Sequence, residues 1–250
     1  MTPDFSAITR LSREKECIGI HAFSLAKEME GFLSHGHRIV KMKVGTDFAT
    51  KLDYDVERVR LVRETIGPDA ELAIDGNHSF TVREALRFAD KVQKYNIAWF
   101  EEPIHGFDFR GYGELTESCP VPVAAGESVR NHYMFTPYLD AGIRHFQPVP
   151  SSFAGVWEWM QVRDMAVRSG IRFSSGGLPL LACPLIATAG DEAMEEFLEV
   201  CNQPVLDCME VTVQRRDGKF YLPDIPGLPF RLDMKWLKKN GYLLSYERCS

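Results

Sequence analysis

The sequence predicts an α/β protein: a modified (β/α)8 TIM barrel of parallel strands with a short C-terminal β/helix extension. Short apolar, β-rich runs alternate with longer amphipathic segments along most of the 250 residues, which is the pattern of a parallel α/β protein. Three carboxylates, Asp75, Glu101 and Glu127, recur at intervals of 26 residues. Each ends an apolar run just before a Gly- or Pro-containing turn, as the last residue of a barrel strand would.

The individual elements follow from the same alternation. The predicted strands cover residues 17–23, 38–44, 71–75, 97–103, 121–127, 144–149, 171–175 and 197–201. Helices are predicted over residues 54–67, 82–96, 155–170 and 180–196, where apolar residues recur at helical spacing and Gly closes several segments. Together they predict a closed barrel over residues 14–205, after a tail of residues 1–13. The alternative is an open doubly wound sheet, but its usual phosphate-binding glycine turn is absent from the sequence.

Residues 206–250 change in character. A turn is predicted at Arg216, Asp217 and Gly218, followed by a Pro- and Gly-rich strip at residues 223–229. We expect a short β excursion and a terminal helix packed on the barrel as an extension.

The composition argues against some classes of binding partner. Apolar residues make up 45% of the chain, enough for a sizeable core, and the net charge is −6 without any basic run. Nucleic acid and anionic membranes are therefore not expected partners. The sequence has no apolar signal segment at its start, which predicts a cytoplasmic location. Its six cysteines lack zinc-ligand spacing and are expected to be reduced and structural.

The three carboxylates predict a metal site. The carboxyl ends of parallel strands meet at one rim of a barrel, so Asp75, Glu101 and Glu127 should converge there. Oxygen ligands are what Mg²⁺ prefers, with further positions left for water or substrate. Any one of these carboxylates could instead cap a helix or pair with a lysine. Three carboxylates at equivalent positions of successive strands favour a metal site over these alternatives.

Two lysines accompany them on the preceding strand. Lys41 and Lys43 are two residues apart, so both face the same way. A lysine within this apolar run is costly to bury unless it meets negative charge. A nearby metal and a second ammonium should lower the pKa of a lysine there, which allows it to act as a base. The alternative is two surface lysines on an edge strand.

The motifs KMK, DGN, FEEP and GES, in this order and spacing, resemble the barrel domain of the mandelate racemase and muconate-lactonizing branch of the enolase superfamily. The resemblance implies that Lys43 is the base and that Lys41 neutralises a substrate carboxylate. It implies Mg²⁺ ligands at Asp75, Glu101 and Glu127, with Asn77 beside them. Glu102 is interpreted as a structural carboxylate and not as a ligand.

The sequence also departs from this family. Racemases of the group carry a second base on the opposite face of the substrate, and those positions here hold Gln147, Val149 and Gly176. None of these side chains takes up a proton, so chemistry with a single base is expected. Glu199 resembles an eighth-strand glutamate that acts as an acid in part of the family, with a surface glutamate as the alternative.

Substrate contacts are expected at the rim. Gln147 and His105 are predicted to meet the substrate, and His78 and His132 are further histidines on rim loops. A lone histidine is more often a structural residue, and that is the alternative for each of these three.

Members of the family carry an α+β capping domain before the barrel, whereas sixteen residues precede the first predicted strand here. The chain is then a fragment, works with a cap from elsewhere, or does not turn over substrate. The predicted function is a Mg²⁺-dependent dehydratase of sugar acids. The alternatives are a racemase or epimerase, and a catalytically silent metal-binding barrel. The resemblance also allows a homo-oligomer.

Overall fold

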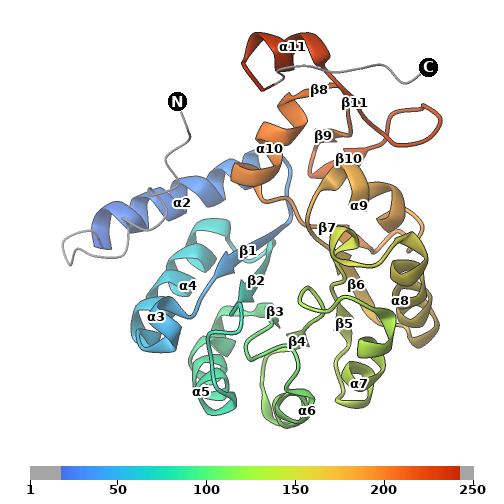
Figure 1. Ribbon diagram of the computed structural model, residues 1–250. Coiled ribbons are helices and arrows are strands. Elements are labelled where there is room, and N and C mark those ends of the chain that lie inside the picture. Colours follow the sequence, from blue (N-terminus) through green and yellow to red (C-terminus); the bar gives the residue numbers. More distant parts are fainter. Residues whose placement is uncertain (1–17, 243–250) are drawn as a thin grey trace.

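The computed structural model describes residues 18–242 of the 250-residue chain. Its central feature is a run of parallel strands that curves into a barrel, with helices on the outside (Figure 1). The strands are β1 (Ile39–Lys43), β2 (Glu71–Asp75), β3 (Ile97–Glu101), β4 (Val123–Ala124), β5 (His145–Phe146), β6 (Arg172–Ser175) and β7 (Met194–Glu195). A parallel bridge between Ala125 and Phe146 joins β4 to β5 and makes the array continuous. The predicted α/β barrel class is confirmed.

Helices connect the strands in turn. Before β1 lies α2 (Ile18–Ser34), and α3 (Thr46–Ala49), α4 (Leu52–Ile66), α5 (Val82–Val92) and α6 (Phe109–Ser118) follow the first three strands. The second half of the barrel has α7 (Phe135–Asp140), α8 (Val156–Ser169), α9 (Pro179–Ile186) and α10 (Glu199–Asp207). Three short 3₁₀ turns are η1 (Gln93–Tyr95), η2 (His132–Met134) and η3 (Pro150–Ser152).

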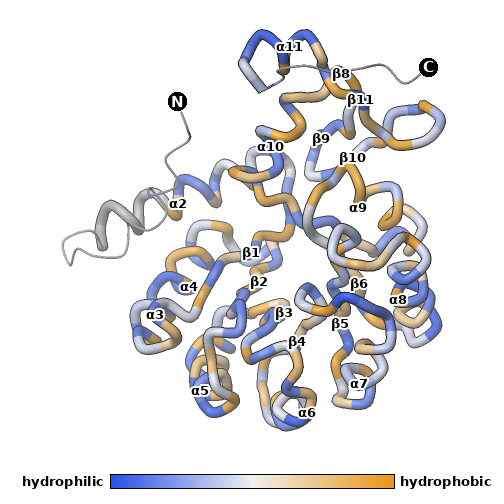
Figure 2. Tube along the Cα trace, viewed as in Figure 1, coloured by the Kyte–Doolittle hydropathy of each residue, from blue (hydrophilic) through white to orange (hydrophobic). Residues whose placement is uncertain are grey.

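The amphipathic pattern explains how these helices pack. Helix α5 begins at a capping box in which Thr81 and Glu84 satisfy each other's backbone N–H groups. Phe88 on its apolar face is completely buried and stacks on Phe80 with ring centroids 5.4 Å apart. Apolar residues accordingly lie inside the ring of helices and polar ones outside (Figure 2). The helices predicted at residues 54–67, 82–96 and 155–170 are confirmed by α4, α5 and α8.

Two predicted strands are wrong. From residue 18, the first predicted strand (17–23) is the start of helix α2, because no Gly or Pro separates it from the helix-forming residues that follow. The last predicted strand (197–201) contains the start of α10, and the seventh strand lies earlier, at Met194–Glu195. The helix predicted over 180–196 correspondingly ends at Ile186. In the described residues the array therefore has seven parallel strands, where the sequence predicts eight.

Residues 209–239 form two small antiparallel strand pairs and a helix. Strands β9 (Gln214–Arg216) and β10 (Lys219–Tyr221) make a hairpin at the predicted turn. Strand β8 (Met209–Val211) pairs with β11 (Arg231–Leu232), and α11 (Met234–Lys239) follows. The Gly218 N–H donates to the His35 carbonyl at 2.9 Å, which holds the hairpin turn against the loop before β1. A separate apolar cluster lies between α9, α10 and this extension.

Two further findings concern the helices and the cysteines of the described residues. Among residues 18–242, no helix is both long and apolar enough to cross a bilayer. The four described cysteines, Cys119, Cys183, Cys201 and Cys208, are free thiols. Cys17 and Cys249 lie outside the described residues.

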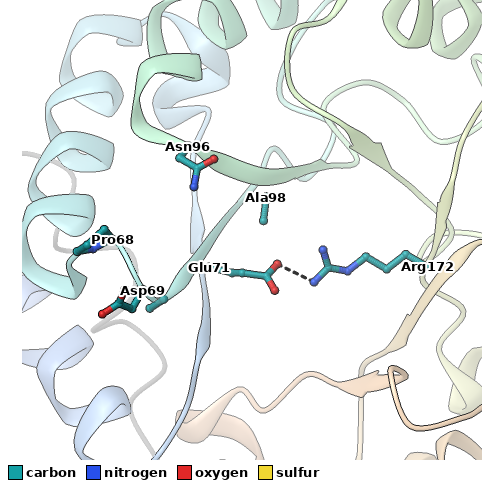
Figure 3. A pocket seen from close by; sticks show the side chains of 7 residues that line it. Pro68, Asp69, Glu71, Asn96, Ala98 and Arg172 are labelled. Atoms are coloured by element: carbon teal, nitrogen blue, oxygen red, sulfur yellow. Dashed lines mark hydrogen bonds and ion pairs between the residues drawn. The ribbon is translucent and has the colours of Figure 1, made fainter.

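The two ends of the barrel differ in chemistry. At the amino ends of the strands, Arg172 pairs with Glu71 at 2.7 Å and lies over the Trp99 ring. This pair borders a depression of about 250 Å³ that is also lined by Pro68, Asp69, Ala70, Asn96 and Ala98 (Figure 3). Arg172 and Glu71 neutralise each other there, and Asp69 leaves one further negative charge in the lining. The carboxylate cluster lies at the opposite end, where the strands finish.

Candidate metal centre and active site

Strand register brings the predicted residues together. Lys43 on β1 is paired with Asp75 on β2, and Asp75 is paired with Glu101 on β3. Paired residues of neighbouring parallel strands point to the same face of the sheet. These three side chains therefore lie in one row across the carboxyl end of the barrel.

Glu127 reaches the same place from a loop. Strand β4 ends at Ala124, which is the residue paired with Glu101, so Glu127 lies three residues beyond the strand. Gly126 makes this turn with φ of +131°, and a Cβ atom there would lie 2.7 Å from the Phe135 ring. One carboxylate oxygen from each of Asp75, Glu101 and Glu127 lies within 4.8 Å of the other two.

The spacing and chemistry of this cluster fit a small divalent cation. Mg²⁺ binds oxygens at about 2.0–2.1 Å, which places neighbouring ligand oxygens about 3–4 Å apart. The three carboxylates need only small side-chain adjustments to reach that geometry. Burial raises the pKa of both Glu101 and Glu127, because a buried carboxylate is poorly hydrated, and a cation in the cluster would stabilise their charged forms.

The two lysines occupy different depths. Lys41 is the deeper one, with a side chain 13% exposed, and its Nζ lies 2.6 Å from Glu101 Oε1, 3.4 Å from Asp75 Oδ2 and 3.0 Å from Glu196 Oε1. Lys43 is 59% exposed and bonds Asp75 Oδ2 at 2.5 Å. Both face the carboxylates, as their spacing predicts.

The pKa of Lys41 is shifted upward, whereas the sequence predicts a lowered pKa for a lysine at this site. Burial alone lowers the pKa of a lysine, but the carboxylates of Glu101, Glu196 and Asp75 outweigh it and raise the pKa of Lys41. Without a cation in the site, Lys41 is therefore held as an ammonium ion. The more exposed Lys43 lies nearer the opening of the barrel.

Glu101 is held by neutral donors as well. Gln147 donates to Glu101 Oε2 at 2.6 Å, and the Trp99 indole N–H donates to the same oxygen at 3.3 Å. The Gln147 side chain is thus buried against a predicted ligand, and its carbonyl oxygen has no protein partner among the described residues.

The other predicted contacts lie at the rim. Asn77 is exposed, and its backbone N–H donates to Asp75 Oδ1 at 2.9 Å. His105 is exposed on the loop after β3, with its ring centroid 5.7 Å from that of His78. His132 pairs with Glu158 at 2.6 Å.

The expected location of Glu199 on an eighth strand is wrong. Glu199 begins helix α10, and its carboxylate lies 3.3 Å from the Arg215 guanidinium. Strand β7 ends at Glu195, four residues before Glu199, so Glu196 is the glutamate that directly follows the strand. Its contact with Lys41 brings Glu196 into the cluster.

Gly176, one of the positions where the family carries a second base, lies beside Glu196. Val149 and Gly176 are neighbours, and a Cβ atom on Gly176 would lie 3.0 Å from Glu196 Oε2. The carboxylate of Glu196 thus occupies the space next to Gly176. The sequence contained a signal for Glu196, because the turn residues around Gly190 separate the helix from the run that ends in Glu195 and Glu196.

Residues 24–236 match a family described as enolase C-terminal domain-like. This chain belongs to the enolase superfamily. The match covers most of the chain and confirms membership of the mandelate racemase and muconate-lactonizing branch.

Relatives with named activities act on sugar-derived acids or lactones. The chain is 33% identical to a D-galactarolactone cycloisomerase of Agrobacterium fabrum over 59% of this chain and 38% of the relative. It is 27% identical to an L-talarate/galactarate dehydratase of Salmonella typhimurium over 77% of this chain and 47% of the relative. This enolase superfamily chain spans about half the length of the curated relatives that it matches.

Solved structures show the same barrel. A racemase from Streptomyces coelicolor with bound magnesium superimposes with a TM-score of 0.78 and 27% identity, over 87% of this chain and 59% of that one. A 3,6-anhydro-D-galactonate cycloisomerase from Zobellia galactanivorans superimposes with a TM-score of 0.78 and 26% sequence identity. The superposition covers 87% of this chain and 62% of that one.

Proposed function

We propose that this chain binds Mg²⁺ through Asp75, Glu101 and Glu127 and removes the α-proton of a sugar acid, with loss of water from the β-carbon. The observation that carries the proposal is the convergence of three carboxylates and two lysines at the carboxyl end of the barrel. Dehydratases of sugar acids among the relatives support the choice of reaction.

Mg²⁺ would supply positive charge beside the substrate carboxylate, where negative charge develops as the α-proton leaves. Lys43 is assigned as the base because its ammonium group is the more exposed of the two and lies at the barrel opening. Lys41 stays charged and neutralises the buried carboxylates and the incoming substrate.

Glu196 is assigned the role that the sequence gives to Glu199. When the α-proton passes to Lys43, the electron pair moves toward the β-carbon and the bond to its hydroxyl breaks. The leaving hydroxyl needs a proton to depart as water. Glu196 is the carboxyl group beside the cluster, its side chain is 37% exposed, and it would deliver a proton taken up from solvent. The enol product then rearranges to a 2-keto-3-deoxy acid.

The racemase alternative requires a proton donor on the opposite face of the substrate. Val149 and Gly176 supply none, and Gln147 is bonded to Glu101. This favours elimination over racemisation. The homo-oligomer and the cytoplasmic location stay predictions, as do the boundaries of the barrel at residues 14 and 205.

The test is a screen of sugar acids with Mg²⁺, read as formation of a 2-keto-3-deoxy acid. We expect one acid to be converted and Lys43→Ala to abolish conversion. Glu196→Gln and Glu199→Gln form a matched pair, because the residues are three positions apart and only the first contacts the cluster. Conversion should fall in Glu196→Gln and persist in Glu199→Gln.

Other outcomes identify the alternatives. Exchange of the α-proton with solvent deuterium without elimination indicates a racemase or epimerase. Bound Mg²⁺ with neither elimination nor exchange on any acid indicates a silent barrel and refutes the proposed reaction.

A further inference from the structure

Glu102, the second glutamate of the FEEP motif, is buried yet takes no part in the proposed reaction. Its exposed fraction is 1%. It follows the last residue of β3 with φ of +31°, a left-handed conformation that is unfavourable for a residue with a side chain. Such strain persists only where surrounding contacts hold the residue in place.

The carboxylate of Glu102 holds both neighbours of Glu127. Its Oε1 accepts the backbone N–H groups of Gly126 and Ser128, each at 3.1 Å. Its Oε2 accepts the Ser128 hydroxyl at 2.6 Å. In the part of the chain that the structure describes, no side-chain hydrogen bond or ion pair holds the Glu127 carboxylate itself, so its position depends on this backbone.

The same carboxylate joins this loop to the loop that follows Asp75. His78 Nε2 donates to Glu102 Oε2, and the His78 backbone N–H donates to the Glu102 carbonyl at 2.8 Å. The Glu102 carboxylate thus accepts hydrogen bonds from both loops, and bonds to a carboxylate are among the stronger ones.

We infer that Glu102 is a positioning residue of the metal centre: its carboxylate binds the loop of residues 126–128 to the loop of residues 76–78 and thereby places Glu127 relative to Asp75. The inference rests on the proposed function in one respect, that the three carboxylates bind a divalent cation. It does not depend on which acid is the substrate or on whether any acid turns over.

The test measures cation affinity directly, by titrating the 250-residue chain with Mn²⁺ and following free Mn²⁺ by electron paramagnetic resonance. In Glu102→Gln an amide NH₂ would face the donors of His78 and Ser128, so the loop should lose its anchor. Residues that orient metal ligands typically change affinity about 10–100-fold, and we expect Kd to rise within that range. Ser128→Ala removes a single donor and should raise Kd less.

Asp55→Asn is the matched control. Asp55 is completely buried and accepts the backbone N–H groups of Gly45 and Thr46 at 2.9 and 2.8 Å and the Thr46 hydroxyl at 2.7 Å. It thus holds the loop after β1 as Glu102 holds the loop after β4, but that loop carries no predicted ligand. We expect Asp55→Asn to lower stability and leave the Kd for Mn²⁺ unchanged.

The outcomes separate the two proposals. The inference is overturned if Glu102→Gln and Ser128→Ala bind Mn²⁺ as the unaltered chain does, or if Asp55→Asn weakens binding as much as Glu102→Gln. If Glu102→Gln does not fold, as judged by thermal unfolding without metal, the Kd for Mn²⁺ of Ser128→Ala is compared with that of Asp55→Asn. The inference then requires weaker binding in Ser128→Ala. An unaltered chain that binds no Mn²⁺ refutes both the metal site and the inference. Binding without turnover of any acid refutes only the proposed reaction.

Discussion

Replacing Lys41 with methionine tests how much of the stability of the barrel depends on compensating its buried carboxylates. The Lys41 ammonium lies 2.6, 3.0 and 3.4 Å from oxygens of Glu101, Glu196 and Asp75. At an effective dielectric constant of about 20, each contact contributes about 5–6 kcal/mol of attraction, most of which the loss of hydration offsets. Removing one partner of such a group leaves unpaired buried charge, which typically costs about 3–5 kcal/mol.

We therefore expect the free energy of unfolding of Lys41→Met, measured with urea in the presence of a chelator, to fall by about 3–5 kcal/mol. For a chain of this size the melting temperature should fall by roughly 6–20 °C. Saturating Mg²⁺ should restore much of the loss, because the cation replaces the missing positive charge and binds only the folded state. Lys41→Met combined with Glu101→Gln should also recover part of it, since one unpaired carboxylate becomes a neutral amide.

The reasoning is refuted by a loss below about 1 kcal/mol, the size expected of an exposed ion pair. It is also refuted if the loss is equal with and without Mg²⁺, because the carboxylates would then not be the groups left uncompensated. Lys91→Met is the control. Lys91 pairs with the exposed Asp53 at 2.6 Å, and its loss should change stability little and independently of Mg²⁺.

Three further predictions concern the fold around the site. Gly126→Ala would place a Cβ atom 2.7 Å from the Phe135 ring, at a backbone with positive φ. It should lower the free energy of unfolding in urea by about 1–3 kcal/mol and weaken Mn²⁺ binding. An unchanged Mn²⁺ affinity would contradict the placement of Glu127 by this turn. Thr81→Ala removes the side-chain half of the capping box with Glu84 and should cost about 1 kcal/mol with Mn²⁺ affinity unchanged. Burial lowers the pKa of His145 to about 3. The unfolded chain, with a His pKa near 6.5, therefore binds more protons between those values, and stability falls as the pH falls from 6.5 toward 3. The stability deficit of His145→Gln should accordingly shrink over that range, and a deficit independent of pH would show that His145 is not held neutral.

Much of the candidate site was predictable because parallel strands repeat. In a βα array each unit returns the chain to the same end of the sheet, so Asp75 and Glu101, one unit apart, are paired across β2 and β3. The two-residue spacing of Lys41 and Lys43 places both on one face for the same geometric reason. These relations are local or periodic, and they can be seen without knowing how distant segments pack.

Contacts between distant segments could not be predicted in this way. The run at residues 17–23 has the composition of a strand, yet from Ile18 it is part of helix α2, because uninterrupted helix formers follow it and Met29 on the same helix is buried in the core. The short strand β7 was hidden for a related reason. Its position depends on pairing with β6, and its two residues are too few to show a period of their own.

The sequence by itself determined the family, the three carboxylates and the two lysines, because each depends on residue type and on spacing along the chain. Only the tertiary structure decided that Glu196 rather than Glu199 joins the cluster. Glu196, just after β7, contacts Lys41, whereas Glu199, three positions later, begins a helix and contacts Arg215. Only the tertiary structure gave Glu102 its partners, because the N–H groups that it accepts lie 24 and 26 residues away. Directed contacts of this kind depend on where loops from separate strands meet, and that position is set by the packing of the whole barrel.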